Sequence, residues 1–113
     1  EVFTHGGREA TGIDAIEYCQ EVANLGAGEI LLTSMDRDGT KLGFDVDLLK
    51  RITSKIYIPV IASGGVGTLE HFSQGILQGG ANSVLAASVF HFGQLKIQDV
   101  KRYLADKNIP VRI

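Results

Sequence analysis

Residues 57–67 read YIPVIASGGVG, an apolar run that ends in glycines and is followed by a helical pattern. We predict a strand from Tyr57 to Ala62 and a helix from about Leu69 to Leu77. Gly64 and Gly65 allow backbone N–H groups to approach an anion closely, and the N-terminus of the next helix adds a positive dipole end. The pattern therefore indicates a phosphate site, although an ordinary strand-to-helix turn has the same features.

A second short apolar run, about one βα unit later, ends in Ala87 and Ser88. In parallel βα barrels, the loops after the last two strands commonly share a phosphate site at the carboxyl ends of the strands. We therefore expect Gly64, Gly65, Ala87 and Ser88 to bind one phosphate group together. Ser88 has no histidine near it in the sequence, so we interpret its hydroxyl as a phosphate donor rather than a nucleophile.

Strand and helix patterns alternate along the chain, which predicts an α/β fold with a parallel sheet. The predicted strands lie at residues 29–34, 57–62 and about 83–87, and helical patterns lie at residues 13–25, 46–52, 69–77 and 97–106. A closed barrel of this kind needs eight strands and about 250 residues. We therefore expect a partial (βα)8 barrel with open sheet edges, which favour pairing with a second copy in a homo-oligomer.

Bulk composition limits the classes of partner. The chain has 113 residues, a length typical of one domain, and a net charge of −2 with scattered basic residues. We expect no nucleic-acid or membrane partner, and a small anionic metabolite is the more plausible ligand. There is no apolar stretch of membrane-spanning length and no leader pattern, so we predict a cytoplasmic protein. Cys19 is the only cysteine and is interpreted as a packing residue of a helix.

The first residues indicate a piece of a longer protein. The chain opens on Glu1 without an initiator methionine, and residues 2–4 already have an extended pattern before the turn-rich residues 4–8. We expect the helix that follows to be capped by Thr11 or Asp14.

Two carboxylates, Asp36 and Asp38, flank Arg37 in the polar loop after the strand predicted at residues 29–34. Carboxylates at the carboxyl end of a barrel strand can hold a hydroxylated substrate or exchange protons with it. In an equally simple interpretation, one aspartate pairs with Arg37 or caps the loop while the other is solvated. The local pattern leaves both interpretations open.

The remaining titratable residues indicate no metal ion and no cofactor. His5, His71 and His91 are far apart and lack the spacing of metal ligands, and the last two adjoin phenylalanines, so we expect packed rings with satisfied nitrogens. Glu29 lies at the start of a predicted buried strand, at the opposite end from the loops. A carboxylate at that end of a barrel usually serves stability.

Three separated segments, in this order, resemble the cyclase subunit of imidazole glycerol phosphate synthase. They are residues 32–40 (LTSMDRDGT) with Gly43 and Asp45, residues 62–67 (ASGGVG) followed by residues 70–72 (EHF), and residues 86–92 (AASVFHF). Residues 2–8 with residues 11–12 are similar to the loop after the fifth strand of that family. The resemblance covers essentially the whole chain.

The resemblance implies a (βα)8 barrel that takes ammonia from a glutaminase partner and cyclises a phosphorylated ribulosyl aminoimidazole substrate in histidine biosynthesis. The substrate carries two phosphates, and one of them would be bound by the glycine and serine loops described above. The implied roles are phosphate binding for Gly64, Gly65, Ala87 and Ser88, active-site lining for Asp36 and Asp38, substrate contact for Gly6, Gly7 and Thr33, and ammonia gating for Glu29.

Parts of the family pattern are absent from this sequence. The principal acid and base of the cyclase are aspartates on its first and fifth strands, and this chain starts after both. The second phosphate site and the charged partners of the ammonia gate also belong to the missing part. The resemblance therefore implies that residues 1–113 are a single C-terminal half-barrel segment that lacks the first five strands and the catalytic pair.

Two alternatives to a cyclase component stay open. The chain can be a catalytically inactive half-barrel that binds phosphate compounds, or a relative of the sister phosphoribosyl sugar isomerase. The isomerase shares the barrel and the Asp-Gly-Thr loop, but residues 36–38 (DRD) and 89–92 (VFHF) favour the cyclase.

Overall fold

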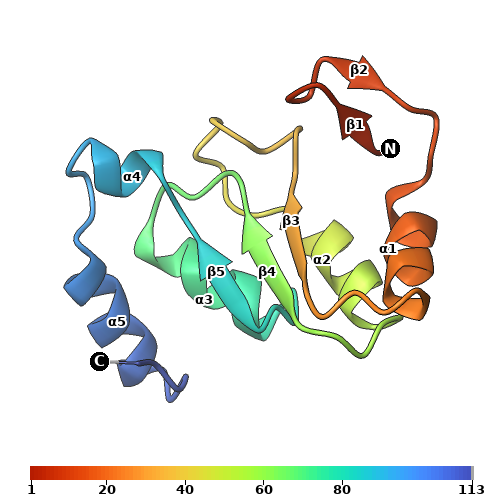
Figure 1. Ribbon diagram of the computed structural model, residues 1–113. Helices are drawn as coiled ribbons and strands as arrows, with labels where there is room; N and C mark the ends of the chain where they lie inside the picture. Colours follow the sequence, from red (N-terminus) through yellow and green to blue (C-terminus); the bar gives the residue numbers. More distant parts are fainter. Residues whose placement is uncertain (113) are drawn as a thin grey trace.

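A three-stranded parallel sheet with helices packed on one face forms the body of the computed structural model, which describes residues 1–112 (Figure 1). Within these residues, no helix is both long and apolar enough to span a bilayer. The elements in chain order are β1 (Phe3–Thr4), β2 (Glu9–Ala10), α1 (Ala15–Asn24), β3 (Ile30–Thr33), α2 (Val46–Thr53), β4 (Val60–Ser63), α3 (Leu69–Leu77), β5 (Ser83–Leu85), α4 (Ser88–His91) and α5 (Ile97–Asp106).

The sheet confirms the predicted α/β architecture of a partial βα barrel. Strands β3, β4 and β5 are neighbours in chain order, and both pairs are parallel. Helix α2 connects β3 to β4, and α3 connects β4 to β5, as in successive βα units. Because the strands are parallel, the loops that follow them all lie at one end of the sheet (Figure 1).

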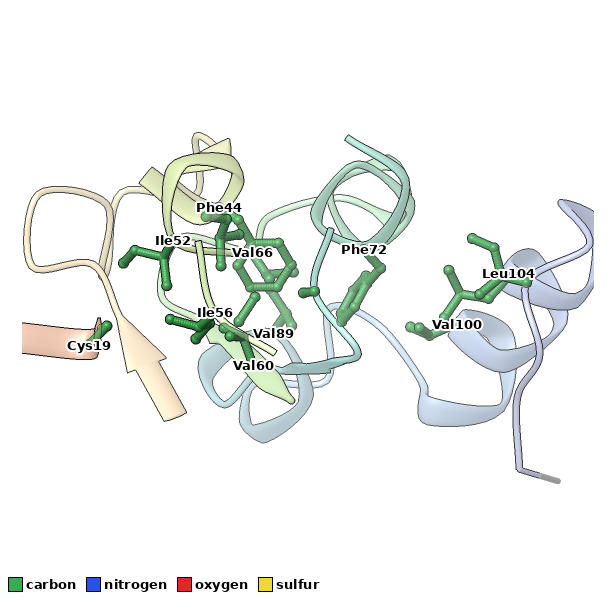
Figure 2. Packing of buried hydrophobic residues seen from close by; sticks show 14 residues of the cluster. Cys19, Phe44, Ile52, Ile56, Val60, Val66, Phe72, Val89, Val100 and Leu104 are labelled. Carbon is green, nitrogen blue, oxygen red and sulfur yellow. The ribbon is translucent and has the colours of Figure 1, made fainter. Parts of the chain in front are cut away.

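The hydrophobic core fills the space between the sheet and the helices. Val60 and Ala62 of β4 are almost fully buried and point to the helical side. On that side the Phe72 ring stacks on Phe90 with centroids 5.9 Å apart and meets Phe44 edge-on at 6.3 Å. Figure 2 shows the core extending past Phe72 to Val100 and Leu104, so α5 is joined to the same cluster.

The opposite face of the sheet and the β3 edge are open. Leu31 and Leu85 alternate with the buried positions and keep 56% and 41% of their surface exposed. The N–H groups of Ile30 and Ser34 donate to the β4 side, to Pro59 and Ser63. Those of Leu31 and Thr33 therefore point away from β4, because strand N–H groups alternate in direction.

All three predicted strands are longer than the observed ones. β3 is one residue shorter at each end, and the structure gives the reason for the differences in β4 and β5. β4 begins at Val60 rather than Tyr57, because Pro59 has no N–H to donate to a ladder, and Tyr57 is fully exposed. β5 ends at Leu85 rather than Ala87. The Ala87 carbonyl accepts the N–H groups of Phe90 and His91, so a one-turn helix, α4, begins directly after this residue.

The N-terminal region contains a hairpin that the sequence did not predict. β1 and β2 pair antiparallel around a turn in which Gly6 and Gly7 have φ of 66° and 87°. Strands of two residues are too short to show a recognisable alternation of apolar and polar residues. The sequence therefore indicated only the turn between them. The predicted cap by Asp14 is confirmed, since its carboxylate accepts the Glu17 N–H at 3.0 Å, and α1 begins directly after it.

Candidate functional site

A small cavity lies where the loops after β4 and β5 meet. Its volume is about 180 Å³, and Gly64, Gly65, Ala87 and Ser88 all line it. The structure thus brings together the four residues predicted to bind phosphate. Cavities that enclose whole metabolites occupy roughly 300 Å³ or more. This cavity therefore suits a single small group rather than an entire substrate.

Backbone N–H groups around the cavity lack acceptors. Gly64, Gly65 and Val66 are buried, yet their N–H groups donate no hydrogen bond within residues 1–112. The N–H groups of the exposed Ala87 and the half-buried Ser88 donate none there either. Buried backbone donors are almost always paired in folded proteins. An acceptor placed in the cavity is therefore the natural partner for these donors, and an oxyanion supplies several acceptor atoms at once.

The start of α3 contributes differently from the prediction. The sequence indicated that the N-terminus of this helix would face the anion. In the structure, the N–H groups of Gly67 and Thr68 donate to Nδ1 of His71, at 2.9 and 3.2 Å, and neither residue lines the cavity. The donors open to a ligand are therefore those of the preceding loop. The predicted satisfied ring nitrogen of His71 is confirmed.

Glycine is required at position 65 by a close approach of two loops. The N–H of Gly43, in the loop after β3, donates to the Gly65 carbonyl at 2.7 Å. Gly65 has φ of 105°, and a Cβ at this position would overlap the Gly43 carbonyl group. A side chain would therefore be strained in its backbone conformation and would also separate the two loops.

The loop after β3 brings two charged residues to the same cavity, Asp38 and Lys41. Lys41 was not identified from the sequence. Its position depends on how the loop folds back, with the Thr40 hydroxyl donating to the Arg37 carbonyl at 2.6 Å and Lys41 in the left-handed region at φ 59°. In the sequence, Lys41 is simply a basic residue next to the Asp-Gly-Thr motif. That pattern does not predict which cavity Lys41 lines.

Asp36 and Asp38 do not share one cavity. Asp38 lines the small cavity, whereas Asp36 lines a larger neighbouring one. Arg37 forms no ion pair with either aspartate within residues 1–112, and its guanidinium donates to the Leu42 carbonyl at 3.4 Å instead. The alternative in which Arg37 pairs with an aspartate is therefore wrong.

The larger cavity, of about 690 Å³, runs beside β3 between α1 and the N-terminal hairpin. It is lined by Gly6, Gly7, Thr33 and Asp36, so the residues predicted to contact the substrate are brought together here. Gly7 packs directly against the Met35 side chain, which leaves no space for a Cβ. The hairpin turn is thereby held close to the loop after β3.

Two further titratable residues can be placed. Cys19 also lines the larger cavity, and burial, with a smaller contribution from the Asp14 carboxylate, raises the pKa of its thiol, so the thiolate is disfavoured. Glu29 is exposed, lies immediately before β3 at the amino end of this strand, and lines neither cavity. Among residues 1–112, no three His, Cys, Asp or Glu side chains are arranged to hold a metal ion.

The family model described as histidine biosynthesis protein matches residues 1–96. The chain belongs to this family. The matched range contains every residue that lines either cavity and all three strands of the parallel sheet. Membership in the histidine biosynthesis family therefore agrees with the partial βα barrel, and it assigns the chain to a family of biosynthetic enzymes.

We predict that Gly65→Ala lowers the free energy of unfolding by more than about 1 kcal/mol, because the added Cβ occupies a left-handed position and overlaps Gly43. Gly28→Ala is the matched control. Gly28 has open space around its Cβ position and no positive φ, so its loss should stay within about 0.5 kcal/mol. Urea denaturation measures both values, and equal losses would contradict the close loop packing.

Proposed function

We propose that the chain is the C-terminal half of the cyclase subunit of imidazole glycerol phosphate synthase, and that it supplies one of the two phosphate sites for the substrate. The observation that carries this proposal is a set of unpaired backbone donors at one cavity. Gly64, Gly65, Val66, Ala87 and Ser88 all line the small cavity, and their N–H groups have no acceptor within residues 1–112.

A phosphate in the cavity would accept hydrogen bonds from these N–H groups and from the Ser88 hydroxyl. Hydrogen bonds to a charged acceptor contribute about 1.5 to 3 kcal/mol each when both partners are well placed. Lys41 adds a positive charge at the same cavity, which offsets the repulsion between the anion and Asp38. The loop is preorganised by the Gly43–Gly65 contact, so little ordering is needed on binding.

Anchoring the phosphate would orient the rest of the substrate. The larger cavity adjoins the loop after β3, and Thr33 and Asp36 line it. A substrate held by its phosphate near β4 and β5 would place its reacting end over β3, where the exposed Asp36 carboxylate can bind hydroxyls or exchange protons. We assign Asp36 this supporting role and Asp38 a role at the phosphate end.

The sister isomerase is the second candidate, because the phosphate cavity and the Asp-Gly-Thr loop would serve either reaction. The cyclase is favoured by the extra carboxylate, Asp36, in the larger cavity and by the segment of residues 89–92. In the cyclase interpretation, the longer protein works with a glutaminase subunit, and Glu29 at the far end of β3 takes part in gating ammonia.

The resemblance also sets a limit on activity. In the family that the chain resembles, the principal acid and base of the cyclase are aspartates on the first and fifth strands, and residues 1–113 resemble only the part that follows both. We therefore propose that residues 1–113, as a half-barrel lacking the first five strands, bind phosphate compounds without turnover. Catalysis would require the N-terminal half of the barrel.

Ser88→Ala is expected to weaken the binding of inorganic phosphate by about 1.5 kcal/mol or somewhat more, at least about a tenfold rise in Kd, because one hydrogen bond to a charged group is lost. Isothermal titration calorimetry measures the change. Ser83→Ala is the control, since Ser83 lies at the opposite end of β5 and lines neither cavity. An unchanged affinity for Ser88→Ala would refute the assigned site.

Complementation distinguishes the cyclase from the isomerase. Mixing the purified chain with the N-terminal half of a cyclase barrel is expected to restore ammonia-dependent cyclisation, whereas the corresponding half of the isomerase should restore no isomerisation. Asp36→Asn should lower the restored turnover and leave the phosphate affinity unchanged. A complex that binds phosphate but never turns over would contradict the cyclase assignment.

We also propose that the isolated chain self-associates through the open side of its sheet. Leu31 lies on this side, and the unpaired N–H groups of β3 adjoin it. Light scattering should give an oligomer mass, and Leu31→Lys should shift it towards the monomer. Leu25→Lys is the control, because Leu25 is equally apolar and 79% exposed but follows α1 and is not part of the sheet. A monomeric wild-type chain would overturn the proposal.

A further inference from the structure

We propose that His71 is a positioning residue of the phosphate cavity, although its side chain does not line that cavity. The inference rests on the phosphate site proposed above. In this proposal, the imidazole holds the glycine loop in the conformation that presents its N–H groups, and phosphate affinity depends on a residue that does not contact the phosphate.

Nδ1 of His71 makes a pair of hydrogen bonds. This atom accepts the N–H groups of Gly67 and Thr68, at 2.9 and 3.2 Å. An imidazole nitrogen that accepts hydrogen bonds carries no proton, so the tautomer that makes these two bonds has its hydrogen on Nε2. The two donors are the residues that directly follow the loop of residues 64–66. Glutamate or glutamine usually plays this part at the third position of a helix, and here histidine reaches one residue further back.

The other edge of the His71 ring contacts Gly43. A Cβ built on Gly43 would lie 3.2 Å from Cδ2 and 3.4 Å from Nε2 of His71, so the ring packs against the backbone of the loop after β3. The Gly43 N–H in turn donates to the Gly65 carbonyl at 2.7 Å. The imidazole therefore joins the end of the glycine loop to the same residue that contacts its middle.

His71 is itself anchored to the hydrophobic core through the next residue. The next residue, Phe72, is 2% exposed and lies in the core (Figure 2). Its ring packs on both Phe44 and Phe90. The His71 ring is thus attached to a helix turn that cannot shift without disturbing the core. Through His71, the end of the glycine loop is attached to the core, and the two glycines of this loop have φ of 94° and 105°.

Loss of the imidazole acceptor has a defined consequence. Gly67 and Thr68 would have to find other acceptors, and the glycine loop would sample more conformations, since glycine is the least restricted residue. Phosphate binding would then include the cost of ordering this loop. Affinity would fall although every atom that touches the phosphate is still present.

The test uses two complementary substitutions. His71→Leu fills the space but removes the acceptor, and we expect the Kd for inorganic phosphate to rise at least about fivefold. His71→Asn supplies a carbonyl oxygen near the position of Nδ1 and should recover most of the affinity. Ser73→Ala is the matched control. It removes the hydrogen bond from the buried Ser73 hydroxyl to the Glu70 carbonyl in the same part of α3, and should lower stability without changing the Kd.

Amide hydrogen exchange provides a readout that needs no ligand. In His71→Leu, the amides of Gly65 and Val66 should exchange at least several-fold faster than in the wild type, and His71→Asn should restore the slower rate. The positioning role is overturned if His71→Leu changes neither quantity more than Ser73→Ala, or if asparagine restores nothing. A wild-type chain that binds no phosphate, or Ser88→Ala with unchanged affinity, would overturn the phosphate site itself, and faster exchange in His71→Leu would still show that His71 holds the loop.

Discussion

The hydrogen bond from the Gly43 N–H to the Gly65 carbonyl, at 2.7 Å, is the contact on which the site depends. It brings the loop after β3 against the loop after β4 so closely that only glycine fits at position 65. Because the two loops are in contact, the charged residues Asp38 and Lys41 reach a cavity whose backbone donors come from β4 and β5. This backbone contact adds the loop after β3 to a cavity that the loops after β4 and β5 form, so three consecutive βα units line it.

The hydrophobic core holds in place the strands and the helix that carry these two loops. The core is confined to one side of the sheet, where Val60, Ala62 and the ring of Phe72 are nearly inaccessible to solvent. It fixes the carboxyl ends of the strands and the first turn of α3. The other side remains open at Leu31 and Leu85. A partial barrel can thus hold its loops in place with a core on only one face of its sheet, because the loops depend on the helix-covered face.

The separation of Asp36 and Asp38 gives the two carboxylates different tasks. They are two residues apart in the sequence, but one lines the larger cavity beside β3 and the other lines the cavity of about 180 Å³. In the proposed cyclase, the phosphate end and the reacting end of the substrate would be held on the two sides of the same loop. Arg37, between them, serves the loop itself by donating to the Leu42 carbonyl.

The order and type of the main elements follow from the sequence alone, because apolar periodicity and glycine positions are local properties of the chain. The sequence also located four residues that line the cavity of about 180 Å³, since parallel strands place their following loops at one end. Three features follow only from the folded arrangement: Lys41 lines the same cavity, Asp36 and Asp38 line different cavities, and Nδ1 of His71 accepts the N–H groups of Gly67 and Thr68. These outcomes depend on how loops distant in sequence fold against one another. The short hairpin and the start of β4 after Pro59 depend on hydrogen-bond partners, which hydrophobic periodicity does not predict.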